Sequence, residues 1–424
     1  MALKSLRSIN ARDGREYVEV RAVKSRWQPL LVYVLVSSLC TGLLFAIYPA
    51  IDPATGWNDH FFYWGQANAW FGLNQPLMLT PEVQTLLDTY RVDYYYDIAN
   101  GDSQQPPYVY RIGVPIVAGL LGTVMSLGTA FLAISIASFV ILGVSSAVAV
   151  RRLSGSRQLA LVAIPIAICA PGFSSFTRFY AMVDMPSIAL VSLTLALVIS
   201  GRFYPALVIA SILAPLVKET SIALAFFVAA FRWLQGDRGW IKWLFALLPI
   251  PLIIALRLLT PVPSPPAMSE LFVAASPFES INTFVAAFGF ALPLIVGMLA
   301  PAVRPLFVSS LPVIMTLIVV TSSVVATGQR IWLTMWPFVV VLGLRGLQSM
   351  ANSIRQLITL VAVALLGIGL ANIVELGFVD RVLMTVWLLL VVGTLGLISA
   401  INLHRRVLRR QKESREALDF EQEL

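Results

Sequence analysis

The sequence predicts an all-α polytopic membrane protein with about 12 transmembrane helices and a long first extracytoplasmic loop that carries interfacial helices. Of its 424 residues, 58% are hydrophobic and only 12% are charged. A soluble chain of this length carries about twice that charged fraction. Apolar runs near the length that crosses a bilayer, about 20 helical residues, recur along the chain. The net charge of +8 reports orientation in the membrane rather than nucleic-acid binding, because the basic residues gather between particular runs.

The predicted spans follow one another at short intervals. They cover residues 28–50, 130–150, 159–170, 186–200, 205–217, 220–234, 241–258, 282–302, 306–326, 332–347, 357–374 and 381–402. A further apolar run, 112–127, either spans or lies in the outer interface. If it spanned, Arg151, Arg152 and Arg157 would share a side with the long loop, against the positive-inside rule. We therefore predict an interfacial helix at 112–127.

This arrangement places all but seven of the 30 basic residues on the inner side of the membrane. The seven outward residues are Arg91, Arg111, Arg178, Lys218, Arg257, Arg330 and Arg381. The same rule divides residues 205–232 into two short helices that meet at Lys218-Glu219-Thr220, where Pro215 loosens the end of the first. One long helix would instead bury Lys218 and Glu219 in the middle of the membrane.

The predicted domain organisation is simple. Residues 1–27 form a cytoplasmic N-terminal tail, 28–402 a transmembrane catalytic domain, and 403–424 a cytoplasmic C-terminal tail. Within the domain, 51–111 is the first extracytoplasmic loop. A largely polar stretch of more than twenty residues precedes the first apolar run, so we predict that the N-terminus is not a cleavable signal peptide. The two cysteines, Cys40 and Cys169, lie in or beside apolar runs and are expected to be packing residues.

The first loop holds the leading catalytic candidate, Asp59, within Trp-Asn-Asp-His-Phe-Phe-Tyr-Trp. Flanking aromatic residues would restrict hydration of this carboxylate, raise its pKa and allow it to take a proton from a hydroxyl nucleophile. The alternative is structural, with Asn58 or Asp59 capping a short interfacial helix. His60 beside Asp59 could assist a divalent metal, but two adjacent residues do not make a metal site. We expect no tightly bound metal and leave a loosely held one open.

Several short motifs occur in a characteristic order. An acidic residue follows the first span, and Tyr110, Arg111 and Pro115 form a Tyr-Arg-x-x-x-Pro pattern on an amphipathic segment. They are followed by Asp184-Met185-Pro186, Lys218-Glu219-Thr220-Ser221 and Gln329-Arg330. In this order the motifs resemble the membrane-embedded class C (GT-C) glycosyltransferases.

This resemblance implies transfer of a sugar from a polyprenyl-phosphate carrier to an acceptor hydroxyl on the extracytoplasmic face, usually with inversion. It implies that Asp59 is the catalytic base, with Asp52 as the weaker match. Many members show an Asp-Glu or an Asp-x-x-x-Tyr pattern here, and Asp59 with Tyr63 fits the second form and not the first. The expected substrate-binding residues are His60, Tyr63, Tyr110, Arg111, Asp184 and Glu219.

The leaving lipid phosphate gains a negative charge, so an outward cation would stabilise the transition state. The candidates for binding the donor phosphate are Arg330, Lys218 and Arg178, and the planar guanidinium favours the two arginines. Each candidate has a structural alternative. Arg330 could anchor the interface beside Trp332 and Trp336, Lys218 could neutralise Glu219, and Arg178 could pair with Asp184.

Two other functions compete with glycosyl transfer. A polysaccharide polymerase or ligase acting on lipid-linked glycans usually carries its large loop late in the chain, whereas here it follows the first span. A multi-span transporter predicts charges near the middle of the bilayer, whereas these charges lie at span ends. The expected partners are a polyprenyl-phosphate sugar donor, an acceptor that the sequence does not identify, and the lipid bilayer, without nucleic acid. The expected location is a bacterial inner membrane with both termini in the cytoplasm.

Overall fold

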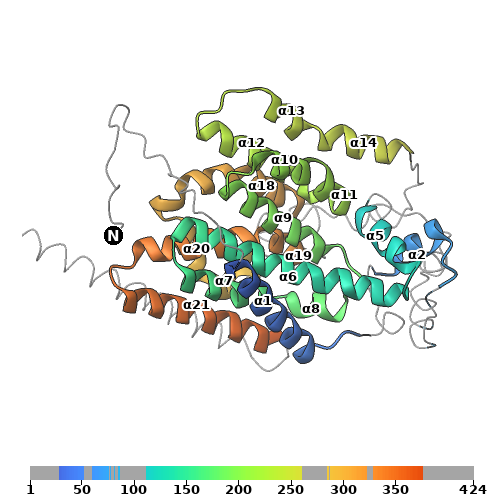
Figure 1. Ribbon diagram of the computed structural model, residues 1–424, viewed down its shortest axis with the longest axis horizontal. Helices are drawn as coiled ribbons and strands as arrows, with labels where there is room; N and C mark the ends of the chain where they lie inside the picture. Colours follow the sequence, from blue (N-terminus) through green and yellow to red (C-terminus); the bar gives the residue numbers. More distant parts are fainter. Residues whose placement is uncertain are drawn as a thin grey trace, which may run out of the picture.

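The computed structural model of the protein describes residues 28–51, 60–75, 77, 81, 85, 111–259, 284–285, 287–321 and 328–375. Every regular element in these ranges is a helix (Figure 1). The first half contains α1 (Gln28–Ile47), α2 (His60–Phe71), α5 (Gly113–Gly122), α6 (Leu127–Ser154), α7 (Arg157–Ile168), α8 (Phe173–Arg178), α9 (Asp184–Ile199) and α10 (Phe203–Val208). The π-helix η2 (Ile209–Leu213), α11 (Ala214–Val217), the 3₁₀ turn η3 (Glu219–Ile222), α12 (Ala223–Leu234), α13 (Ile241–Leu247) and α14 (Pro249–Leu259) follow.

The C-terminal part is helical in the same way. It contains η4 (Gly289–Ala291), α17 (Leu292–Met298), η5 (Pro301–Val303), α18 (Arg304–Thr321), α19 (Gly328–Trp332), η6 (Leu333–Met335), α20 (Trp336–Met350) and α21 (Ile354–Glu375). The helices run back and forth along the long axis of the molecule (Figure 1).

Five helical segments in the described part of the chain are long and apolar enough to cross a membrane. They are Pro29–Ile47, Leu127–Ser154, Pro301–Thr321, Arg330–Met350 and Ile354–Ala371. The chain is therefore an α-helical integral membrane protein, as predicted.

Other apolar helices are shorter than a straight span. They include Gly113–Gly122, Arg157–Ile168, Asp184–Ile199, Phe203–Val217 and Ile241–Leu256. At about 1.5 Å per residue, a ten-residue helix such as α5 is about 15 Å long, half of the hydrocarbon core. The predicted runs up to 357–374 fall largely on helical segments, and 381–402 lies outside the described residues. A total of about twelve spans stays a prediction.

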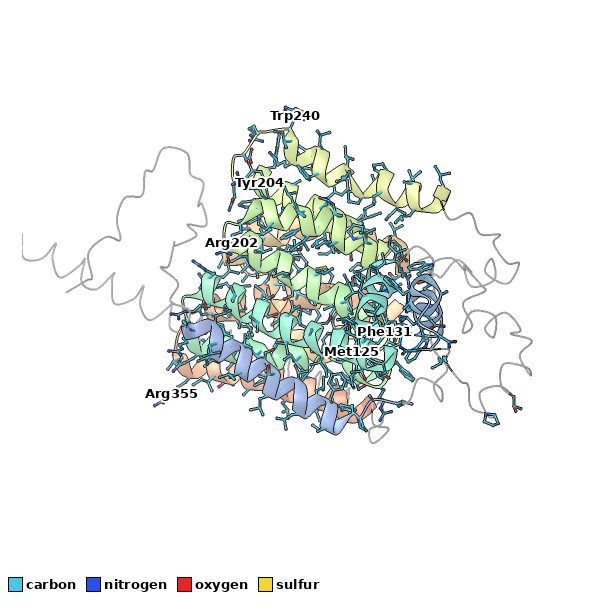
Figure 2. All side chains as sticks on the ribbon, turned by 45° about the vertical axis from the view of Figure 1, so that its right-hand side comes forward. Met125, Phe131, Arg202, Tyr204, Trp240 and Arg355 are labelled. Atoms are coloured by element: carbon cyan, nitrogen blue, oxygen red, sulfur yellow. The ribbon has the colours of Figure 1, made fainter. Side chains whose placement is uncertain are left out.

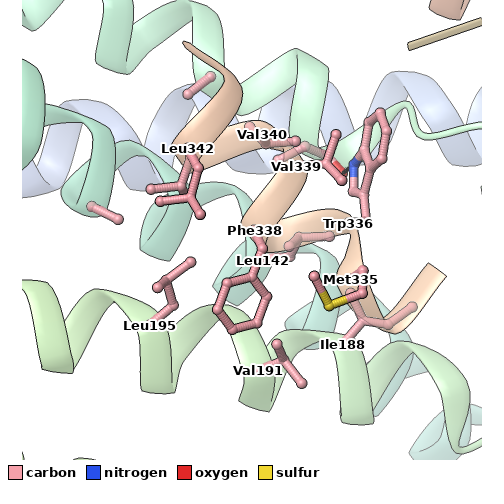
Figure 3. Packing of buried hydrophobic residues seen from close by; sticks show 14 of the residues in the cluster. Leu142, Ile188, Val191, Leu195, Met335, Trp336, Phe338, Val339, Val340 and Leu342 are labelled. Atoms are coloured by element: carbon pink, nitrogen blue, oxygen red, sulfur yellow. Dashed lines mark hydrogen bonds between the residues drawn. The ribbon is translucent and has the colours of Figure 1, made fainter. Parts of the chain in front are cut away.

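The core of the bundle is built around α20. A helix that is apolar on all sides lies either in lipid or inside the protein, and α20 lies inside, because nearly every side chain from Trp336 to Leu347 is buried. Phe338 meets Phe227 of α12 edge to face at 4.9 Å between ring centroids. Figure 3 shows Phe338 and Leu342 among Leu142, Val191 and Leu195 of α6 and α9. This packing holds together the helices whose ends carry the polar residues.

The bundle has two different ends (Figure 2). We call the end with α2, α5 and the start of α6 the loop end. The opposite end, where Ser154 finishes α6, is the basic end, and there Gln348 of α20 donates a hydrogen bond to the Ser154 carbonyl at 3.2 Å. Met125 and Phe131 lie toward the loop end, and Arg202, Tyr204 and Arg355 lie toward the basic end.

Candidate functional site

Five charged side chains from separate parts of the chain meet at the loop end. We call them the charged cluster: Arg111 before α5, Asp184 at the start of α9, Lys218 and Glu219 between α11 and α12, and Arg330 in α19. Four of them stand at or beside a helix end, and Arg330 lies within the single turn of α19 that leads through η6 into α20. The helix packing described above therefore brings these residues together, although up to 146 positions separate the members of a pair.

Asp184 joins two cations through its two carboxylate oxygens. Lys218 Nζ lies 2.6 Å from Oδ1, and Arg330 Nη2 lies 2.6 Å from Oδ2. The side chains of Asp184 and Lys218 are 2% and 6% exposed, whereas that of Arg330 is 26% exposed. A buried carboxylate is tolerated when cations and hydrogen bonds compensate for its lost hydration. Arg330 is thus the member of this group that a molecule outside the bundle can reach.

Arg111 and Glu219 form the second half of the cluster. The Arg111 guanidinium donates from Nε to Glu219 Oε2 at 2.8 Å and from Nη2 to Oε1, a two-point arrangement suited to a carboxylate. Its third contact is a hydrogen bond from Nη1 to the hydroxyl of Tyr63 at 2.9 Å. Tyr63 is a fully buried residue of α2, so this contact fixes α2 against the cluster.

The electrostatic state of Glu219 follows from this pairing. Burial opposes ionisation of the carboxyl group, but the adjacent Arg111 charge and its hydrogen bonds outweigh that effect, so the pKa of Glu219 lies below its ordinary value of 4.5. Glu219 is therefore ionised at neutral pH. Among the described residues, the cluster holds three cations against two carboxylates, an excess of one positive charge.

The backbone conformation explains why Lys218 and Glu219 form ion pairs with different residues. α11 ends at Val217, and Lys218 is extended, with φ −156° and ψ 125°. Successive side chains of extended backbone point to opposite sides. Lys218 consequently faces Asp184 and Glu219 faces Arg111, so the predicted alternative of a mutually neutralising Lys218–Glu219 pair is not the arrangement found.

A polar contact that the sequence analysis did not single out lies next to the cluster. The hydroxyl groups of Ser187 and Ser221 are 3.0 Å apart and buried. Each serine stands three residues after a member of the Asp184–Lys218 ion pair, and residues three apart lie on one face of a helical turn. In both Asp-Met-Pro-Ser and Lys-Glu-Thr-Ser the serine follows the charged residue by three positions, and this shared spacing could have indicated a second contact between the two segments.

Arg178 lies outside the charged cluster. It is an exposed residue at the end of α8, and its guanidinium lies over the ring of Tyr48 at 6.0 Å. Its carbonyl accepts a hydrogen bond from the Ile51 N–H at 3.0 Å, at the point where the first loop begins. Asp184 contacts Lys218 and Arg330 instead of Arg178, which corrects the alternative pairing expected from the sequence.

The two tryptophans near Arg330 are buried in the bundle rather than placed as interface anchors. Trp332 is 4% exposed and Trp336 is fully buried. Trp336 donates a hydrogen bond to the Ala167 carbonyl at 3.0 Å and stacks on Phe288. The predicted alternative role for Arg330, an interface anchor beside Trp332 and Trp336, therefore gains no exposed aromatic partner from these two residues.

Three predicted site residues, Asp52, Asp59 and Tyr110, lie outside the described residues, as does the side chain of His60. His60 is nevertheless the first residue of α2. Within the described residues, no group of three His, Cys, Asp or Glu side chains is placed to hold a metal ion. No family model, curated protein or solved structure matches this chain.

Proposed function

We propose that the protein is a membrane glycosyltransferase that moves a sugar from a polyprenyl-phosphate donor to an acceptor hydroxyl at the loop end. The observation that supports this proposal is the excess positive charge of the cluster together with the partial exposure of Arg330. A lipid-linked phosphate is the kind of anion that such a group attracts. The proposal also assigns the loop end to the extracytoplasmic face and both termini to the cytoplasm of a bacterial cell.

The proposed reaction is a single displacement. Asp59 takes the proton of the acceptor hydroxyl, whose oxygen attacks the anomeric carbon of the sugar. The bond between that carbon and the phosphate oxygen breaks, and the electron pair stays on the phosphate. The phosphodiester becomes a phosphomonoester with one more negative charge, which a nearby guanidinium stabilises most in the transition state.

The exposure of the cations separates their proposed roles. The side chain of Arg330 is 26% exposed, more than that of Lys218 or Asp184, so a phosphate outside the bundle can reach it. Lys218 is nearly inaccessible, and we assign it to holding Asp184 in place. Arg178 does not belong to the charged cluster, so it could contact only a part of the substrate that lies away from the cluster. This division narrows the three phosphate candidates to Arg330 as the leading one.

The position of α2 supports Asp59 as the base. Asp59 directly precedes His60 at the start of this helix, and Tyr63, in its first turn, contacts Arg111. In the sequence, Asp59 is therefore four positions before a residue that is hydrogen-bonded to the cluster. The predicted helix N-cap role of Asp59 remains the structural alternative.

The test is sugar release from a labelled polyprenyl-phosphate donor by purified Asp59→Asn and Arg330→Ala variants. Loss of the base should lower turnover by about 10²–10⁴-fold, and loss of the phosphate-binding guanidinium by about 10²–10³-fold. Arg178→Ala is the matched control, because it removes an outward arginine that the cluster does not contain, and it should stay within a few fold. Normal turnover in both site variants at normal membrane levels would refute these roles.

The same preparations distinguish the competing functions. A polymerase or ligase would use lipid-linked glycan chains in preference to a single-sugar donor. A transporter would move solute into vesicles without releasing sugar from the lipid.

A further inference from the structure

The basic end of the bundle carries a surface that the proposed reaction does not use. Arg232, Arg238 and Lys242 surround the turn between α12 and α13. Arg202 immediately precedes Phe203 of α10, and the Arg232 guanidinium lies 4.2 Å from the centre of the Phe203 ring. With Asp237 as the carboxylate of this turn, the surface holds four cations against one anion. It is independent of glycosyl transfer and of the charged cluster at the loop end.

Asp237 fixes the shape of the turn. Its carboxylate accepts hydrogen bonds from Arg232 Nε at 3.0 Å, the Gly239 N–H at 2.9 Å and Lys242 Nζ at 3.3 Å. Lys242 also donates to the carbonyls of Asp237 and Gly239, and its side chain is 5% exposed. Lys242 and Asp237 therefore serve the turn itself.

Arg238 and Arg202 are the exposed cations of this surface. The Arg238 guanidinium lies over the Trp233 ring at 4.2 Å. A guanidinium stacked on a ring uses its flat face, so its N–H edge stays available for the oxygens of a phosphate. Trp233 and Tyr204 are themselves exposed, as amphipathic aromatic residues are at a membrane interface.

An apolar strip runs from this basic group along the outer helix of the bundle. α13 and α14 lie at its periphery (Figure 1). Their exposed hydrophobic residues recur about every three to four positions, which places them along one side of the helices. They are Trp240, Ile241, Leu244, Leu247, Leu248, Ile250, Ile254 and Leu258.

We propose that this surface binds an anionic phospholipid of the bilayer, with the phosphate beside Arg202 and Arg238 and the acyl chains along α13 and α14. The occupant follows from the chemistry of the two parts. Basic residues beside a membrane attract anionic headgroups, and the apolar strip continues from them in the direction of a lipid tail. A zwitterionic lipid would satisfy the strip without compensating the surplus of positive charge.

The experiment measures retention of phosphatidylglycerol and phosphatidylcholine on the purified full-length protein by native mass spectrometry, alongside thermal unfolding in detergent micelles supplemented with each lipid. The wild type should retain phosphatidylglycerol preferentially and unfold at a higher temperature with it. A double variant, Arg202→Gln with Arg238→Gln, should lose about fivefold in retention for each arginine removed. Trp240→Ala should shorten retention of both lipids, because it removes exposed apolar surface from the strip.

Arg355→Gln is the matched control, an exposed arginine at the same end but on the opposite edge of the bundle (Figure 2). It should leave the preference for phosphatidylglycerol unchanged. An equal loss in the control and the double variant would overturn the proposal in favour of a general effect of net charge. Stabilisation by inorganic phosphate equal to that by the lipid would also overturn it, because the strip would then contribute nothing.

Discussion

The two cations that contact Asp184 differ in burial, and this difference separates a structural role for one from a ligand-binding role for the other. Removing one partner of a buried ion pair leaves the other charge uncompensated, at a cost of about 3–5 kcal/mol. Lys218 is in this position, since both its own side chain and Asp184 are nearly inaccessible. Arg330 is more exposed, so water or a ligand can replace part of what Asp184 provides. The residue best able to bind an incoming phosphate is therefore Arg330 and not Lys218, although both lie 2.6 Å from the Asp184 carboxylate.

Glu219 should make the stability of the protein depend on pH in acid. Its pKa is lower in the folded protein than its ordinary value of 4.5, so its pairing with Arg111 stabilises the fold fully above that value. The stabilisation is lost as the pH falls through the lower folded pKa. We expect Glu219→Gln to melt at a lower temperature than the wild type at pH 7, and the difference to shrink as the pH falls below 4.5 toward the lower folded pKa of Glu219. Thermal unfolding in detergent between pH 3 and pH 8 measures this.

The partner side of the pair provides the comparison. Arg111→Gln should reverse the contribution of Glu219 to the pH dependence, because the cation that lowers the carboxyl pKa is gone while burial still raises it, so ionisation of Glu219 would then destabilise the fold. A constant difference between the wild type and Glu219→Gln from pH 8 to pH 3 would contradict a stabilising ion pair at this position.

The backbones of α17 and α20 approach each other closely at glycine residues where the two helices cross. A Cβ atom on Gly346 would overlap the carbonyl oxygen of Gly297, and one on Gly297 would overlap that of Gly343. The obstacles are backbone atoms, which cannot rotate aside as a side chain can. We expect Gly346→Ala to destabilise the protein by about 1–3 kcal/mol or more, as overpacking does, and to lower its melting temperature by several degrees.

The control for this crossing is Gly369→Ala in α21. No atom lies within 4 Å of the Cβ position there, and alanine favours a helix over glycine by about 1 kcal/mol. Gly369→Ala should therefore leave the melting temperature unchanged or raise it slightly. Equal effects of the two alanine variants would mean that helix propensity, rather than the crossing, determines the result.

The hairpin from α10 to α12 shows how far the sequence predicts an element. The charge distribution predicted two helices meeting at Lys218-Glu219-Thr220, and the described helices do break there, after Val217. The sequence did not indicate the π-helix η2, which ends at Leu213, two residues before Pro215. Proline lacks an N–H and crowds the carbonyl four residues back, which favours such a shift.

The ion pairs within the charged cluster could not be predicted from the sequence, for a physical reason. They join residues 34, 108 and 146 positions apart, and such contacts depend on how the helices pack. Sequence reasoning favoured near neighbours, Lys218 with Glu219 and Arg178 with Asp184. The sequence did predict that Asp184 lies at the start of a helix and that Lys218 and Glu219 lie between two helices, because helix ends can be inferred from local composition.

Across the whole molecule, the charges of the described residues are distributed unequally between the two ends. The basic end carries Arg151, Arg152, Arg157, Arg202, Arg232, Arg238, Lys242, Arg304, Arg345 and Arg355, with Asp237 as its acidic residue in the described ranges. At the loop end, Arg111, Lys218 and Arg330 are largely balanced by Asp184 and Glu219. Basic residues are retained on the cytoplasmic side of membranes, so this distribution predicts which end faces the cytoplasm.

Cysteine labelling tests that orientation. In a background with Cys40 and Cys169 replaced by alanine, Thr123→Cys marks the loop end and Leu153→Cys marks the basic end. We expect a membrane-impermeant maleimide to label position 123 in intact cells and position 153 only after permeabilisation. The positive-inside rule is the physical reason, since moving the basic end outward would carry its arginines across the bilayer. Labelling of position 153 in intact cells would reverse the orientation and place the charged cluster, with Arg330, on the cytoplasmic side, away from an extracytoplasmic acceptor.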